Sequence, residues 1–138
     1  MTNLEKAREM LLAKTYGNCV LYGDEIIHTS KKQGIAPMLE FLSAGLDMKG
    51  FSAADTVAGK ALALLMVYAG VSEVYADVMS RGAVEIFERF EVRHVYSELT
   101  EQINNRAGDA ICPMELAVMN TWEPEEAYKI LSDKTQKP

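Results

Sequence analysis

The chain has 138 residues, of which 49% are hydrophobic and 25% are charged, and its formal net charge at pH 7 is -6. These values are typical of one ordinary globular domain and argue against disorder outside the two ends. The acidic balance and the scattered lysines and arginines argue against a nucleic-acid-binding surface, which needs clustered positive charge. A small anionic ligand stays compatible with this balance, because one positive pocket can exist on an acidic protein.

Cysteine usage and hydropathy predict the compartment. Cys19 and Cys112 form no CxxC motif, so the sequence offers neither a zinc ribbon nor a dithiol redox site, and reduced thiols in the cytoplasm are expected. The longest apolar run covers residues 61–69, far fewer than the roughly 20 residues that cross a bilayer. The N-terminus also lacks the apolar core of a signal peptide. We therefore expect no membrane partner.

The first elements expected along the chain are a helix and a hairpin. Apolar residues recur at helical spacing over residues 4–12. Two short β-type runs follow, over residues 19–22 and 25–28, and Gly23-Asp24 separates them. This spacing predicts a hairpin with a two-residue turn.

Two helices are expected next. The first covers residues 35–44, with Pro37 tolerated in its first turn. The second is predicted to begin at Ser52, because Ser52 and Asp55 have the spacing of a capping box, and to end at Gly70. Since this second helix is apolar nearly all round, it should be the central, buried helix.

The rest of the chain is expected to alternate strands and helices: a strand over residues 74–78, a helix over 81–90, a strand over 92–96, a loop over 104–109, and helices beginning at Pro113 and Pro124. A hairpin followed by β-α-β crossovers implies a mixed sheet with helices on both faces. The sequence therefore predicts an α/β fold, a three-layer α/β/α sandwich, as a single domain over residues 1–133 with a flexible tail over 134–138.

Familiar catalytic and metal motifs are incomplete. Gly59-Lys60 resembles the end of a phosphate-binding loop, but Ala54 stands where its first glycine would be and Ala61 where its Ser or Thr would be. The two histidines have no partner at metal-ligand spacing, so neither a metal nor another cofactor is expected.

The order hairpin, helix, strand, helix, strand resembles the cytidine deaminase fold. In that family, a His-Ala-Glu or Cys-Ala-Glu motif supplies one zinc ligand and the catalytic glutamate, and Pro-Cys-x-x-Cys supplies two more ligands. Residues 57–61 and 80–84 can be laid on these motifs without gaps. The zinc-ligand positions then hold Val57, Arg81 and Val84, and the glutamate position holds Gly59. The resemblance therefore implies the fold without zinc-dependent deamination.

A closer resemblance, over about residues 19–118, is to an uncharacterised prokaryotic family of zinc-less, deaminase-like proteins, a domain of unknown function. The stretches that carry it are residues 34–37, 55–65, 105–108 and 111–115. In such a fold two helix N-termini face one pocket, where free N–H groups attract anions. The residues expected to bind a ligand there are Asp55, Gly59, Lys60, Ser80, Arg81, Gly82, Asn105, Arg106 and Cys112.

Three hypotheses for function follow. The leading one is a non-catalytic or regulatory domain that binds a small nucleotide-like or phosphate-bearing ligand in this degenerate pocket. The second is a metal-independent transferase or hydrolase that uses Asp55, Cys112 or Glu115. The third is a homo-oligomeric interaction module with an empty pocket. Asp55 as a helix cap and Cys112 as a small buried residue are the structural alternatives at those two positions.

Overall fold

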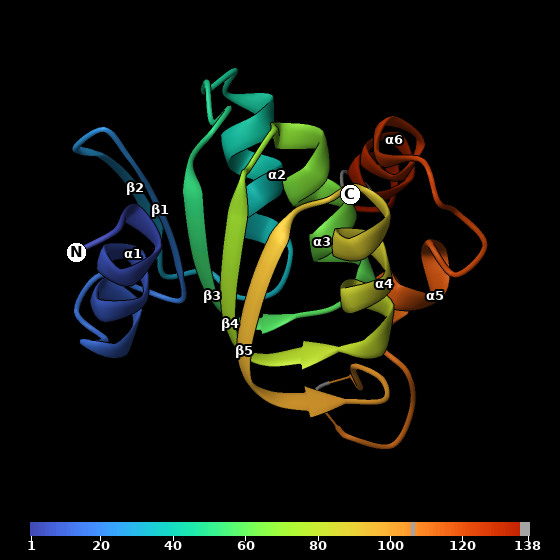
Figure 1. Ribbon diagram of the computed structural model, residues 1–138. Helices are drawn as coiled ribbons and strands as arrows, with labels where there is room; N and C mark the ends of the chain where they lie inside the picture. The colour runs from blue at the N-terminus through green and yellow to red at the C-terminus, as the bar shows by residue number, and fades with distance from the viewer. Residues whose placement is uncertain (106, 136–138) are drawn as a thin grey trace.

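The computed structural model describes residues 1–105 and 107–135 (Figure 1). Within these residues the chain forms, in order, α1 (Asn3–Leu12), β1 (Cys19–Gly23), β2 (Ile26–Ser30), α2 (Ala36–Ser43), β3 (Ser52–Ala58), α3 (Lys60–Ala69), β4 (Glu73–Ser80), α4 (Arg81–Arg89), β5 (Arg93–Thr100), α5 (Pro113–Ala117) and α6 (Pro124–Thr135). No helix in this part of the chain is long and apolar enough to cross a membrane.

The strands form one mixed sheet in the order β2-β1-β3-β4-β5. β1 pairs antiparallel with both β2 and β3, whereas β3, β4 and β5 run parallel to one another. The parallel strands are joined by α3 and α4, since a parallel connection needs a crossover (Figure 1). The predicted mixed sheet and α/β fold are therefore confirmed.

The hairpin turn lies one residue later than predicted. Gly23 pairs with Ile26, so the two turn residues are Asp24 and Glu25 rather than Gly23 and Asp24. Asp24 has φ of +48° and Glu25 has φ of +70°, the left-handed backbone that both central residues of a type I′ turn need. Gly23 instead serves close packing, because an added Cβ would lie 2.5 Å from the Phe51 ring.

The prediction of a helix beginning at Ser52 was wrong, because residues 52–58 form the central strand β3. The Ser52 hydroxyl donates to Glu73 on β4 at 2.7 Å instead of capping a helix. Small residues suit this strand, since β3 is hydrogen-bonded to β1 and β4 and most of it is buried. α3 begins at Lys60 and ends at Ala69, and Gly70, with φ of +84°, caps it in the left-handed conformation at the predicted stop.

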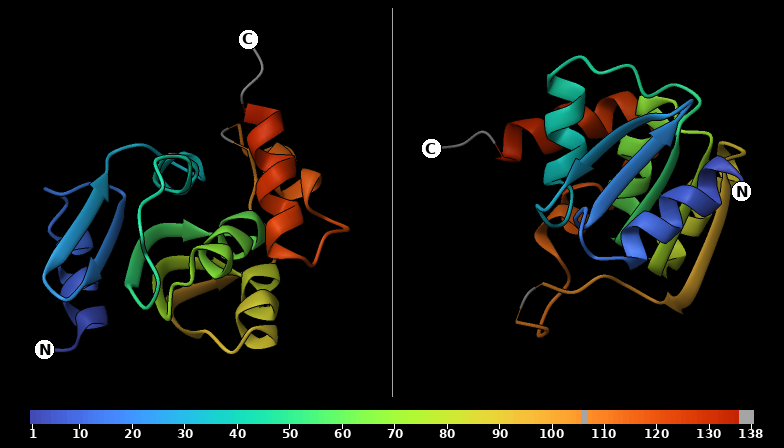
Figure 2. Two further views of the ribbon diagram at one scale, coloured as in Figure 1. Left: turned by 90° about the horizontal axis from the view of Figure 1, so that it is seen from above. Right: turned by 90° about the vertical axis from the view of Figure 1, so that its left-hand side faces the viewer.

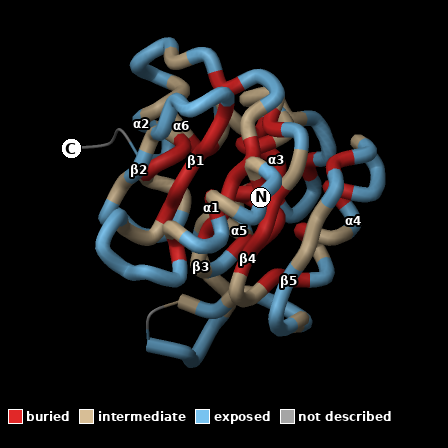
Figure 3. The backbone as a smooth tube through the Cα atoms, turned by 60° about the vertical axis from the view of Figure 1, so that its left-hand side comes forward, coloured by how far each residue is buried: buried red, intermediate tan, exposed pale blue. Residues whose placement is uncertain are grey.

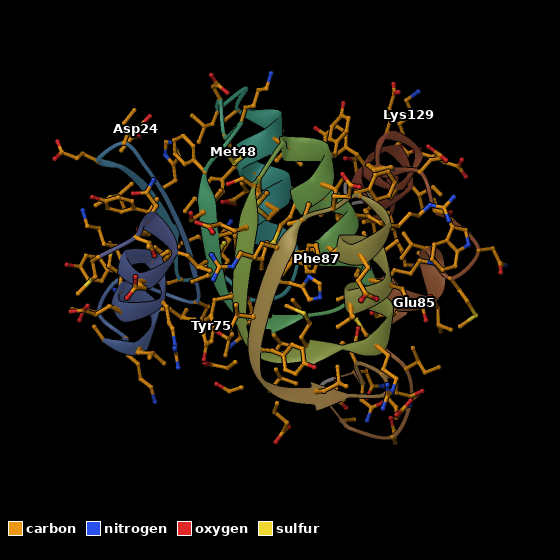
Figure 4. All side chains as sticks on the ribbon, in the orientation of Figure 1. Asp24, Met48, Tyr75, Glu85, Phe87 and Lys129 are labelled. Carbon is orange, nitrogen blue, oxygen red and sulfur yellow. The ribbon has the colours of Figure 1, made fainter. Side chains whose placement is uncertain are left out.

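Helices pack on both faces of the sheet. α1 lies over β1 and β3, where Leu4, Ala7 and Leu11 pack against Val20 and Ala54, and α3 lies with α2, α4 and α6 on the opposite side (Figure 2). The first seven residues of α3 are all buried, as expected for the central helix. Large side chains fill both cores, among them Met48, Tyr75 and Phe87 (Figure 4).

Burial falls towards the edges of the sheet. Figure 3 shows buried residues through β1, β3, β4 and α3, whereas the residues of the edge strands β2 and β5 are exposed or of intermediate burial. This distribution places the buried polar residues of β3 at the centre of the molecule, where a site can be shielded from solvent.

Candidate functional site

A cavity of about 1100 Å³ opens at the carboxyl ends of the parallel strands. β3, β4 and β5 each contribute a lining residue, respectively Val57, Val78 and Thr100. The N-terminus of α2, the start of α3, residues 102–105 and the start of α5 also contribute to the wall. Because ligands of α/β proteins bind beyond the carboxyl ends of parallel strands, this cavity is the candidate functional site.

Asp55 is the buried carboxyl group of the cavity wall. Its exposed fraction is 4%, and its Oδ1 accepts a long hydrogen bond of 3.4 Å from the Val57 amide. Within the described chain its Oδ2 is buried and has no hydrogen-bond partner. Burial raises the pKa of Asp55 to about 7, although the neighbouring Cys19 thiol and the backbone amides of Val57 and Thr56 act in the opposite direction. Asp55 can therefore accept or donate a proton near neutral pH.

Cys19 supports Asp55 from the neighbouring strand. The two residues are directly paired across β1 and β3, and Cys19 is fully buried. Burial, and then the nearby carboxyl group of Asp55, raise the pKa of the Cys19 thiol well above its usual range. Cys19 therefore stays a neutral thiol beside Asp55 rather than a nucleophile.

Glu115 closes the N-terminus of α3. Its Oε1 and Oε2 accept hydrogen bonds of 2.8 Å from the amides of Lys60 and Ala61, respectively. Burial raises the pKa of Glu115, and the two amide donors oppose this shift. Gly59 permits this contact, because an added Cβ there would lie 2.3 Å from Oε1 and 2.8 Å from a side-chain carbon of Ile103.

The ammonium group of Lys60 is held by the segment after α5. Its Nζ donates to the Met119 carbonyl at 2.9 Å and lies 4.0 Å from the centre of the Trp122 ring. Burial lowers the pKa of Lys60, while the charges of Glu115 and Glu85 raise it. These contacts assign Lys60 a structural role, tying α3 to residues 119–122.

The Ser80-Arg81-Gly82 turn lies at the start of α4. The Ser80 hydroxyl caps the helix by accepting from the Ala83 amide at 3.1 Å. Arg81 is exposed, its Nε donates to Glu101 at 2.5 Å, and this ion pair raises the pKa of Arg81. Arg81 is therefore paired with a surface carboxylate at the start of its helix.

The structure brings only part of the expected ligand-binding set together. Four of these residues line the cavity, namely Asp55, Gly59, Asn105 and Cys112. Lys60, Ser80, Arg81 and Gly82 are not among the described lining residues, and Arg106 lies outside the described chain. Asn105 also organises its own loop, since its Oδ1 accepts from the Gly108 amide at 2.8 Å.

Several lining residues were missed by sequence reasoning. They include the polar residues Asn18, Gln33, Thr56, Gln102 and Asn104. Glu115 was predicted only as a catalytic residue. Its position in Cys112-Pro113-Met114-Glu115, a stretch that carries the family resemblance, could also have indicated a residue of the ligand site. Asn18 and Gln33 stand in ordinary loop sequence, which gives no local sign of a cavity.

The described wall has an acidic character. Its charged side chains are Glu40, Asp55 and Glu115, and no lysine or arginine occurs among its described residues. Across residues 1–105 and 107–135, no three His, Cys, Asp or Glu side chains are grouped so that they could hold a metal ion. The arrangement can thus accept hydrogen bonds from a ligand and exchange a proton at Asp55.

Comparison with known proteins identifies the family. The model of the TM1506 family, a domain of unknown function (DUF1893), matches residues 6–135. The chain belongs to this family. A solved DUF1893 structure, TM1506 from Thermotoga maritima, is 25% identical, with a TM-score of 0.86 over 97% of this chain and 91% of the other. No curated protein matches the sequence.

Proposed function

We propose that this DUF1893 domain binds a small nucleobase-like ligand in the cavity, and that the ligand donates an N–H group to Asp55. The observation that carries this proposal is the Oδ2 atom of Asp55, which is buried and lacks a partner in the described chain. A buried polar atom without a partner costs about 1–3 kcal/mol, and a ligand donor would remove this cost. Because this atom exposes less than 1 Å², the Asp55 side chain must turn towards the cavity before a ligand can donate to it.

The rest of the wall favours a flat, mostly apolar ligand with polar edges. Apolar side chains of Ile35, Leu39, Leu62 and Met114 line the cavity, and side-chain amides of Asn18, Gln102 and other residues offer both donors and acceptors. A heterocycle with N–H and carbonyl edges matches this combination. The acidic wall supports the nucleobase part of a nucleotide-like ligand more strongly than a phosphate.

We also propose that the fold has the cytidine deaminase-like architecture. The hairpin, the α2, β3, α3, β4, α4, β5 order and the strand order support a three-layer, zinc-less member of that architecture. Val57 lies in β3 at the cavity and Arg81 is paired with Glu101. We also propose that the protein is cytoplasmic and forms homo-oligomers. Its acidic charge supports the absence of a nucleic-acid partner.

The test is a thermal-shift screen with free bases, nucleosides and nucleotides, followed by calorimetry of each hit. A ligand at a hundred times its dissociation constant stabilises a protein by about 2.7 kcal/mol, which is readily detected. We expect Asp55→Asn to weaken binding at least tenfold, because a hydrogen bond to a charged group contributes about 1.5–3 kcal/mol. Glu40→Gln is the control, since Glu40 lines the cavity but is exposed and already paired with Lys32. Equal losses in both variants would contradict the role of Asp55.

A second candidate is metal-independent catalysis. Its support is that Asp55 lines the same cavity as Cys112 and Glu115, although it stands more than 50 residues before them in the sequence. Asp55 would act as a proton acceptor and Cys112 as a nucleophile. Mass spectrometry of the protein after incubation with each binding hit tests this candidate through a covalent adduct or a converted ligand. The third hypothesis, an interaction module, is favoured instead if the screen finds no ligand and the protein is a stable oligomer.

A further inference from the structure

The N-terminus of α3 has backbone amides that could bind an anion, but a carboxylate of the same chain already accepts hydrogen bonds from them. α3 has ten residues, and its N-cap, Gly59, has no side chain to accept from the first free amides. The Glu115 carboxylate accepts from two of these amides, those of Lys60 and Ala61, at 2.8 Å each. An anionic ligand group would seek the same donors.

This position lies in the same cavity as Asp55. Gly59, Ala61 and Glu115 all line it, as does Asp55 with its buried Oδ2 atom that has no partner in the described chain. The two observations are independent. The α3 amides already have an acceptor, the Glu115 carboxylate, whereas Asp55 Oδ2 is an acceptor that lacks a donor. Together they distinguish a helix terminus that a carboxylate already covers from a buried carboxyl oxygen that still lacks a donor.

We propose that Glu115 is a specificity-determining residue that excludes phosphate and carboxylate groups from the cavity and thereby selects uncharged, N–H-donating ligands. This inference rests on the proposed function for the identity of the accepted ligand. A phosphate could reach the α3 amides only by displacing Glu115 from both hydrogen bonds. The side chain of Lys60 cannot compensate from its present position, because its Nζ is bound to the Met119 carbonyl and stacked on Trp122.

Glu115→Ala should convert this end of the cavity into an open anion site. The probe is inorganic phosphate, compared with chloride at equal ionic strength, and the readouts are melting temperature and calorimetric affinity. We expect the dissociation constant for phosphate to fall at least tenfold relative to the natural protein. The double variant Lys32→Ala/Glu40→Ala is the matched control, because it removes a carboxylate of the same wall together with its ion-pair partner while the α3 amides stay covered; phosphate affinity should stay at the natural level.

Two results would overturn the inference. One is phosphate binding to the natural protein that is as tight as to Glu115→Ala. The other is a folded Glu115→Ala variant with no gain in phosphate affinity. If Glu115→Ala does not fold, Glu115→Gln decides, since it removes the charge but keeps one acceptor for the α3 amides. That variant should also bind phosphate more tightly than the natural protein, and an unchanged affinity would contradict the inference.

The phosphate experiment separates this inference from the proposed function. Phosphate alone probes the α3 terminus, whereas free bases and nucleosides probe Asp55. Absence of base binding together with a phosphate gain in Glu115→Ala would refute the proposed ligand but support the exclusion of anions. Base binding without a phosphate gain would support the proposed function and refute the role of Glu115.

Discussion

Cys19 and Asp55 face each other across the antiparallel pair of β1 and β3, and both side chains are buried. Ionising a carboxyl group in this buried position costs free energy, and this cost raises the pKa of Asp55 to about 7. Asp55 thus gives the centre of the sheet a proton-exchanging group at the wall of the cavity.

Asp55 should make stability depend on pH. Its pKa is about 7 in the folded protein against an ordinary value of 3.8, so between these values the folded state holds the proton more tightly. The stability that it contributes is present below the lower value and is lost as pH rises through about 7. The loss is on the order of 4 kcal/mol as an upper limit. Urea unfolding at pH 5 and pH 8 captures about 3 kcal/mol of this loss, since part of it falls below pH 5, and Asp55→Asn should remove most of the difference.

Gly59→Ala should destabilise the fold through Glu115. The new Cβ would meet Glu115 Oε1 at 2.3 Å, so the carboxylate must leave the α3 amides. We expect a loss of about 1–3 kcal/mol in the free energy of unfolding. Gly82→Ala is the control, since its Cβ would contact a Lys60 carbon at 3.3 Å and needs only a small adjustment. A smaller cost of Gly59→Ala in the Glu115→Ala background would confirm the coupling, and full additivity would contradict it.

Lys60 and Arg81, both expected from sequence to bind the ligand, should behave differently when they are replaced. Lys60→Met should lower the free energy of unfolding by about 1–3 kcal/mol, because the bond to Met119 and the stacking on Trp122 are lost. Trp122 fluorescence should change with it. Arg81→Ala should change neither melting temperature nor ligand affinity, because Arg81 is exposed and pairs only with surface Glu101 in the described chain. A large affinity loss in Arg81→Ala would restore the anion-binding hypothesis.

The two thiols should differ in access. Cys112 lines the cavity and is partly exposed, whereas Cys19 is fully buried beside Asp55. We expect iodoacetamide to modify Cys112 in the folded protein and Cys19 only after unfolding, as peptide mass spectrometry would show. A bound ligand should slow the modification of Cys112. Modification much faster than that of free cysteine would instead favour the catalytic candidate.

Sequence patterns predicted the outer elements better than the central one. The spacing of Leu4, Ala7 and Leu11 correctly gave α1, and the prolines at the starts of α5 and α6 correctly marked them. β3 was missed because its small residues have weak strand preference and Ser52 and Asp55 imitate a cap. Pairing with β1 and β4 decides its structure, and that contact is not local in sequence.

The site was predicted only in part for the same reason. Asp55 and Cys112 could be chosen by residue type, and the structure brings them into one cavity. The sequence pattern predicts the helix start at Ser52, whereas the helix begins at Lys60. Asp55 therefore does not cap a helix and is a buried residue of the cavity wall. The occupation of the α3 amides by Glu115, 55 residues after Lys60, is a tertiary contact without a local pattern.

The most direct test of the central claim is the titration of the Asp55 carboxyl carbon by ¹³C NMR, with its signal assigned by Asp55→Asn. In the free protein we expect a pKa near 7, because burial raises it. Saturation with the tightest-binding base or nucleoside should lower this pKa, because an N–H donated to Oδ2 stabilises the ionised form. An Asp55 pKa that stays unchanged at saturation would contradict the account, since the ligand would then bind without using this carboxyl group.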